Sequence, residues 1–146
     1  GVKNGLHALA VGYEVGARFG ASLRIRPGMH VDGNWPALGA AAAAARALGL
    51  DPRQTAQAVG IAACQLPLSL YLPVRTGDTA RNTYLGQAAA LGQGAALAAA
   101  SGVTAPPDAA AAYAALALGA LESLATCITG PTLPRPCARR WSTRRA

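Results

Sequence analysis

A histidine in a polar loop, directly before an alanine-rich segment, is the first candidate for chemistry. His30 stands in residues 28–35, GMHVDGNW, which run into the small-residue segment 39–50. An imidazole changes its protonation near neutral pH, and a loop ahead of a helix places it beside the unpaired backbone N–H groups of the first turn. A histidine on a surface loop needs no function, however, so His30 alone would indicate no site.

A second polar loop follows downstream. Residues 77–89, GDTARNTYLGQAA, carry the cation of Arg81, the amide of Asn82 and the phenol of Tyr84, and they too open into a glycine- and alanine-rich segment. Helix N-termini favour anionic ligands because their backbone N–H groups are unpaired. We therefore expect the loops around His30 and Arg81 to lie at neighbouring helix ends and to share one polar pocket.

The elements that must position these loops are helices. Caps, prolines and glycines predict helices over about residues 6–22, 36–48, 51–66, 82–101 and 108–125. Asp51, Pro52 and Gln54 form a capping-box pattern, and Gly49 stands where a left-handed residue ends the preceding helix. No segment alternates with period two for long, so strands are not required. The predicted fold class is all-α, a multi-helix bundle packed through small residues.

Glycines at every fourth position have two interpretations. Gly12, Gly16 and Gly20 share one helix face, a spacing typical of transmembrane dimers and also of tightly packed soluble helices. Glu14 and Arg18 interrupt this segment, which favours the soluble interpretation. The uncharged stretch 82–107 contains glutamines and relies on alanine rather than leucine, so it predicts a buried helix. Without an apolar leader, we expect a cytoplasmic protein with no membrane contact.

The three cysteines and the glycines offer no further chemistry. Cys64, Cys127 and Cys137 are odd in number and unevenly spaced, so we expect reduced thiols, with Cys64 in the core. No metal-ligand spacing and no phosphate-binding glycine loop is present.

The basic charge of the chain is concentrated at its C-terminal end. The net charge is +7, but Arg135, Arg139, Arg140, Arg144 and Arg145 supply five of the thirteen basic residues. A basic tail can attract nucleic acid. The proline-rich start at 131–136 and the scarcity of aromatic residues instead favour a disordered or out-of-frame tail over residues 131–146, so nucleic-acid binding is not the expected function.

Taken in order, these blocks resemble the MmgE/PrpD family. The resemblance runs from about residue 1 to residue 107 and depends on the order and spacing of its blocks. The matching residues are AVGYEV at 10–15 with Arg18, His30, GAAAAAAR at 39–46, LGLD at 48–51, Gln54 with Thr55, AVGIA at 58–62, the loop 81–86, and the alanines 88–89.

The resemblance implies a helical domain that is one part of a longer enzyme. Members of this family look like homodimers with an additional, smaller α+β domain and an upstream acidic and histidine-bearing block, neither of which has a counterpart here. Residues 1–130 are therefore expected to be a partial helical domain that is inactive alone. Members dehydrate 2-methylcitrate, decarboxylate cis-aconitate or epimerise an imino-dicarboxylate, with no metal and no organic cofactor.

For this chemistry we assign a role to each polar residue of the expected pocket. His30 would transfer a proton, Arg81 would bind a substrate carboxylate, Tyr84 would be a supporting donor, and Asn34 and Asn82 would orient the substrate. Many members place lysine at the position of Arg81 and histidine at that of Tyr84, which leaves the substrate open. The alternative is a structural module that only packs against another domain or subunit. A lyase predicts that His30 and Arg81 converge, whereas a packing module leaves them on unrelated surfaces.

Overall fold

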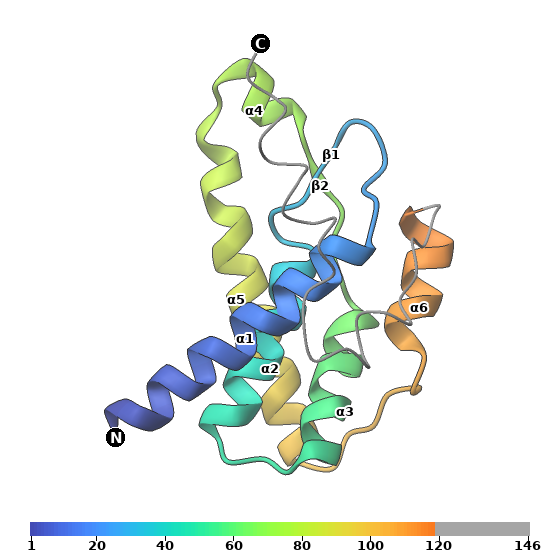
Figure 1. Cartoon of the computed structure of the whole chain (residues 1–146). Coiled ribbons are helices and arrows are strands. Elements are labelled where there is room, and N and C mark those ends of the chain that lie inside the picture. The colour runs from blue at the N-terminus through green and yellow to red at the C-terminus, as the bar shows by residue number, and fades with distance from the viewer. Residues whose placement is uncertain (119–146) are drawn as a thin grey trace.

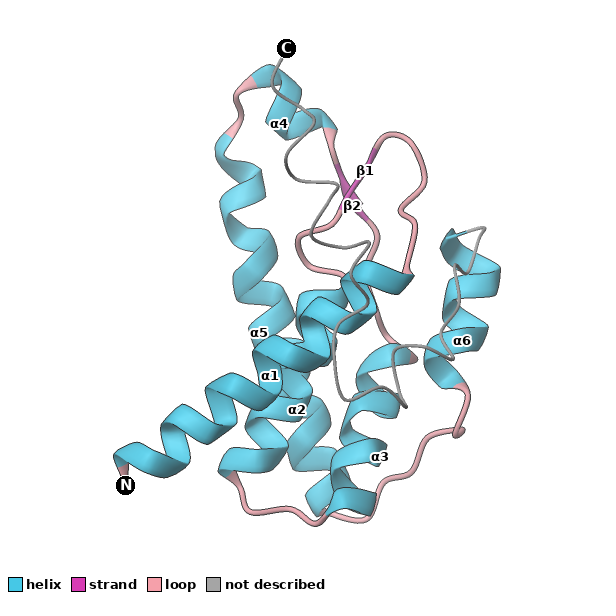
Figure 2. Ribbon diagram, viewed as in Figure 1, coloured by secondary structure: helices cyan, strands magenta, loops and turns pink. Residues whose placement is uncertain are grey.

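A computed structural model describes residues 1–118 of the chain and shows an all-α fold with one very small sheet (Figures 1 and 2). The α-helices are α1 (Val2–Ser22), α2 (Trp35–Ala47), α3 (Pro52–Ala63), α4 (Leu72–Thr76), α5 (Tyr84–Ala100) and α6 (Ala109–Tyr113). A 3-10 turn, η1 (Thr79–Thr83), precedes α5, and a π-helical turn, η2 (Ala114–Leu118), follows α6. The strands are β1 (Met29–His30) and β2 (Ser69–Leu70).

Helix α2 is the centre of the bundle. It packs against α1, α3 and α5, and α3 in turn packs against α5 and α6. Its core-facing side chains are small, and apart from Leu38 they are alanines. Because a methyl group fills little space, such a core is closely packed only if the helix backbones approach each other closely. The fully buried positions of α2 are Ala37, Leu38, Ala41, Ala42 and Ala45.

Glycines make that close approach possible. A Cβ on Gly39 of α2 would lie 2.5 Å from the carbonyl oxygen of Gly12 on α1. A Cβ on Gly20, two turns further along α1, would lie 2.6 Å from the indole nitrogen of Trp35. The glycine face predicted for residues 12–20 is thus a helix-packing face. Among the described residues, no helix is both long enough and apolar enough to cross a membrane.

Local sequence signals set the helix ends between α2 and α3. Gly49 adopts φ 74°, a left-handed conformation that terminates α2. The Asp51 carboxylate accepts from the backbone N–H of Gln54 at 2.7 Å, and the Gln54 side chain accepts from the backbone N–H of Asp51 at 3.2 Å. The predicted capping box is confirmed.

Replacing Asp51 by alanine is expected to lower the free energy of unfolding by about 1 kcal/mol, because the first turn of α3 loses its side-chain acceptor. Urea denaturation followed by circular dichroism measures the change. Asp51→Asn is the control, since asparagine is also a good N-cap residue and should leave stability nearly unchanged. Equal losses in the two variants would show that the carboxylate charge, rather than the cap, is what matters.

The expectation that strands are not needed is wrong in one place. β1 and β2 pair antiparallel, with Met29 opposite Leu70 and His30 opposite Ser69. Each strand has only two residues, too few to produce a period-two pattern, so the pairing depends on backbone hydrogen bonds between loops distant in sequence. Helix α4, in the connection after β2, was also not predicted. Figure 2 shows the pair at the end of the bundle where α4 lies.

Cys64 is exposed rather than buried, because it lies at the C-terminal cap of α3, beyond the apolar face formed by Ala58, Ile61 and Ala62. The predicted fifth helix appears as α6 and η2 as far as residue 118. Its remainder, the tail 131–146, Cys127 and Cys137 lie outside the described residues.

Candidate functional site

The two-strand pairing places an aromatic ring against the candidate histidine. The backbone N–H of Tyr71 donates to the carbonyl of Gly28 at 2.9 Å, which extends the alignment of β1 with β2 by one residue. The rings of His30 and Tyr71 are stacked, with centroids 5.5 Å apart and planes 19° from parallel. The imidazole therefore has one face covered and a defined orientation.

The Asp32 carboxylate connects the two polar loops. Its Oδ2 lies 3.6 Å from Nδ1 of His30 and 3.9 Å from Nη2 of Arg81. The Asp32 side chain is 22% exposed, whereas that of Arg81 is 47% exposed. Residues about fifty positions apart in the sequence thus meet at one acidic group. The Arg81 guanidinium keeps much of its hydrogen-bonding capacity open to solvent, because it has five N–H donors and is only half covered.

A backbone hydrogen bond also fixes His30. The amide N–H of Asp32 donates to Nδ1 of His30 at 3.0 Å, within the turn that follows β1. The imidazole is therefore held on one side by this bond and on one face by Tyr71, and its side chain is only 13% exposed.

Tyr84 lies beside the same histidine. It is the first residue of α5, and its ring centroid is 6.1 Å from that of His30, with the planes tilted by 54°. Its hydroxyl donates to the carbonyl of Leu70 at 3.2 Å. Tyr84 thus supports the strand pair that carries the site, and its proton is already engaged with the backbone.

Asn34 occupies a different environment. It is fully buried and stands at the N-cap position of α2 without a side-chain cap bond. Its amide donates to the carbonyl of Pro67 at 2.9 Å and to the hydroxyl of Tyr113 at 3.0 Å, while its Oδ1 has no partner among the described residues. Burial raises the pKa of Tyr113, and the hydrogen bond with Asn34 opposes this in part. Asn34 connects the His30 loop to the interior and is closed to solvent.

Asn82 lies next to Arg81 on the exposed turn η1. His30, Arg81 and Tyr84 therefore come together, whereas Asn82 is the exposed sequence neighbour of Arg81 and Asn34 is buried and bonded to Pro67 and Tyr113. The sequence reasoning gave no role to Asp32 or Tyr71. Asp32 could have been noticed, since an acid two residues from a histidine can contact it. Tyr71 carried no such signal, because only the strand register brings it to His30.

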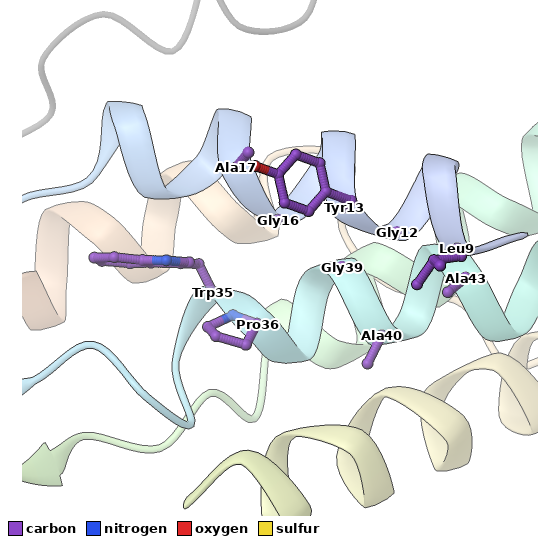
Figure 3. Close-up of a pocket in the computed structure, with 10 residues that line it drawn as sticks. All are labelled: Leu9, Gly12, Tyr13, Gly16, Ala17, Trp35, Pro36, Gly39, Ala40 and Ala43. Atoms are coloured by element: carbon purple, nitrogen blue, oxygen red, sulfur yellow. The ribbon is translucent and has the colours of Figure 1, made fainter. Parts of the chain in front are cut away.

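A separate groove lies between α1 and α2, with a volume of about 390 Å³. Figure 3 shows Leu9 and Tyr13 on α1 and Trp35 and Pro36 at the start of α2, around the glycines where the two helices face each other. Its lining is apolar and offers no cation for a carboxylate. The groove is therefore a poor site for a polar acid, and the polar cluster is the better candidate.

Within residues 1–118 no group of three or more histidine, cysteine or acidic side chains has an arrangement that could hold a metal ion. The chemistry available in the described cluster is that of one imidazole, one carboxylate, one guanidinium and two phenols. Such a set can bind an anion and supply polar hydrogens to it.

Comparison with known proteins yields one match. The family model of the MmgE/PrpD N-terminal domain matches residues 1–123, which is most of the chain. No curated protein and no solved structure matches it.

Proposed function

The chain belongs to the MmgE/PrpD family, and on this premise we propose that it supplies part of the active site of a cofactor-independent lyase or isomerase acting on small polycarboxylates. A 2-methylcitrate dehydratase-like reaction is the leading candidate. The enzyme would work in the cytoplasm, and this helical domain alone would be inactive, because a complete site of the family would also draw on groups outside the helical domain.

The convergence of His30 and Arg81 on the Asp32 carboxylate is the observation that supports this proposal most. A packing module has no need to bring an imidazole and a guanidinium from separate loops to one place. The two residues are also held differently: His30 is largely covered and stacked on a ring, whereas Arg81 is half exposed. The fixed imidazole of His30 suits a group that takes part in the reaction, and the accessible cation of Arg81 suits a group that binds the substrate.

The reaction class explains why these residue types are useful. Loss of water or carbon dioxide from a polycarboxylate passes through or near a carbanion beside a carboxylate, and its charge spreads onto the carboxylate oxygens. A cation and a polar hydrogen aimed at those oxygens stabilise the transition state more than the ground state. Arg81 would bind one carboxylate through two N–H groups, and His30 would act at the reacting end.

Asp32 has a place in this scheme. In the structure its carboxylate faces Arg81, as a substrate carboxylate would. The 3.9 Å separation is longer than a charge-assisted hydrogen bond. An incoming substrate would therefore compete with a weak internal contact, and the anion that makes two short hydrogen bonds would be favoured.

Replacing Arg81 by alanine in a complete enzyme is expected to raise the apparent KM by about tenfold to a hundredfold. A hydrogen bond to a charged group contributes roughly 1.5–3 kcal/mol to binding, and the variant loses this contribution. The measurement uses a chimera in which this domain replaces the corresponding domain of an active family member, assayed with 2-methylcitrate and cis-aconitate. The turnover number kcat should change less than KM, because the lost contact stabilises the bound ground state and the transition state equally.

Arg75→Ala is the matched control, because Arg75 is an exposed arginine on the neighbouring helix α4. It should leave both kinetic constants unchanged. If KM were unchanged in both the Arg81 and the Arg75 variants, Arg81 would not belong to the binding site.

A packing and interaction module is the second candidate function, and one surface favours it. Helix α1 exposes an apolar stripe at the spacing of one helix face: Val2, Leu6, Leu9 and Tyr13, which are between 59% and 82% exposed. Exposed apolar patches of this kind usually become interfaces. The two functions are compatible, since a homodimer formed through such a surface would use it for assembly and the polar cluster for chemistry.

A further inference from the structure

The hydrogen bond between Asp32 and His30 determines where the imidazole carries its proton. A backbone N–H can only donate, so Nδ1 of His30, which lies 3.0 Å from the Asp32 amide nitrogen, must be the acceptor. A neutral imidazole has one protonated and one unprotonated nitrogen. The proton of neutral His30 is therefore on Nε2.

The groups around the ring show where the second proton would go in the positively charged imidazolium form of His30. Four titratable or charged groups lie near His30. Asp32 is in the loop after β1 and Arg81 is in η1, while Tyr71 follows β2 and Tyr84 begins α5. If the imidazole gains a second proton, that proton goes to Nδ1, where Oδ2 of Asp32 lies 3.6 Å away. Nε2 thus keeps its hydrogen in both protonation states. A base at Nε2 would require the opposite tautomer and would lose the Asp32 amide bond.

We propose that His30 acts on the substrate as a permanent Nε2–H hydrogen-bond donor and not as a base, with Asp32 as the positioning residue that enforces this tautomer. The inference rests on the proposed function and assigns the chemical role of one residue within it. The donor would serve a carboxylate oxygen of the substrate as negative charge accumulates there. The proton-transfer role expected for His30 from the sequence is thereby replaced, and the base must be another group of the complete enzyme.

The tautomer can be tested on the whole chain without substrate. In ¹⁵N-labelled protein at neutral pH, a scalar coupling across the hydrogen bond is expected between the Asp32 amide nitrogen and Nδ1 of His30, and the directly bound imidazole proton is expected on Nε2. His7 is the only other histidine and lies exposed on α1, so it is an internal reference, and His7→Gln assigns the signals. A proton on Nδ1 of neutral His30 would overturn the inference.

The donor role is tested with citrate as the probe and with three variants. Glutamine can place an amide N–H near the position of Nε2, whereas asparagine reaches only to that of Nδ1, and neither can transfer a proton as an imidazole does. His30→Gln should bind citrate nearly as tightly as the native chain. His30→Asn and His30→Ala should bind it about tenfold more weakly, as expected for the loss of one hydrogen bond. A glutamine variant as weak as the alanine variant contradicts the donor role.

The two measurements separate the inference from the proposed function. If Nδ1 carries the proton while citrate still binds, the inference alone fails. If the coupling is present but citrate leaves the Nε2–H signal of the native chain unchanged, the donor role fails together with the proposed function. A coupling that persists with citrate, accompanied by a downfield shift of the Nε2–H proton, supports both.

Discussion

Replacing His30 by alanine in a complete, active enzyme carrying this domain is expected to lower kcat by about a hundredfold or more, with a smaller effect on the apparent KM. Loss of a hydrogen-bond donor to a developing oxyanion has an effect of this size. The imidazole is fixed by the Asp32 amide and the Tyr71 ring, so its contribution needs little reorganisation during the reaction. Steady-state kinetics of the chimeric enzyme measure the change.

The control for this substitution is His7→Ala, because His7 is exposed on α1 and distant in sequence from the polar cluster. It should leave turnover unchanged. The thermal stability of both variants should be recorded as well, since a purely structural histidine would show lost stability at normal specific activity. Unchanged turnover in the His30 variant would remove it from the mechanism.

Replacing Gly92 by alanine is expected to lower the free energy of unfolding by about 1–3 kcal/mol, through overpacking of a closed helix interface. Gly92 is buried on α5, and a Cβ there would lie 2.5 Å from both the Cβ of Ala40 and the backbone nitrogen of Ala41 on α2. One of the two contacts is with backbone, so no side-chain rotation relieves it, and the two helices must separate. Chemical denaturation followed by circular dichroism tests this.

Gly94 provides the matched control on the same helix. A Cβ at Gly94 would meet no heavy atom within 4 Å, so alanine fits there without contact. Because alanine favours a helix interior over glycine by roughly 0.5–1 kcal/mol, Gly94→Ala should stabilise the protein. The two substitutions are chemically identical, and their opposite signs would isolate packing as the cause. Stabilisation by both would mean that α2 and α5 do not approach as closely as the structure shows.

Most of the helices, and several of their ends, could be predicted from the sequence because the signals that set them are local, whereas the short helix α4 was missed and α1 begins at Val2 rather than near residue 6. Gly49 and the Asp51–Gln54 capping box act within a few residues of each other, and the structure confirms both. The glycines at every fourth position of α1 predicted a close-packed face, and Gly12 and Gly20 lie against α2 in the structure. A helix depends on bonds between residues four apart, so its pattern is present in the chain itself.

Only part of the site could be predicted, because its geometry depends on segments that are distant in the sequence. The sequence drew attention to His30, Arg81 and Tyr84, and the fold brings these side chains together. It did not separate them from Asn34, which has a similar polar-loop context but lies buried against Pro67 and Tyr113. Whether a loop residue faces solvent or the core depends on which distant segment covers it.

What the sequence by itself determined, then, is the helical class, the main helix boundaries and the two polar loops, all of which follow from residue types within a turn or two of one another. Only the tertiary structure decided the pairing of β1 with β2, the stacking of Tyr71 on His30 and the position of Asp32 between His30 and Arg81. These contacts join segments about forty to fifty residues apart, and their register is set by how the helices pack. No local pattern encodes such a register, because it arises from the combined shape of several elements.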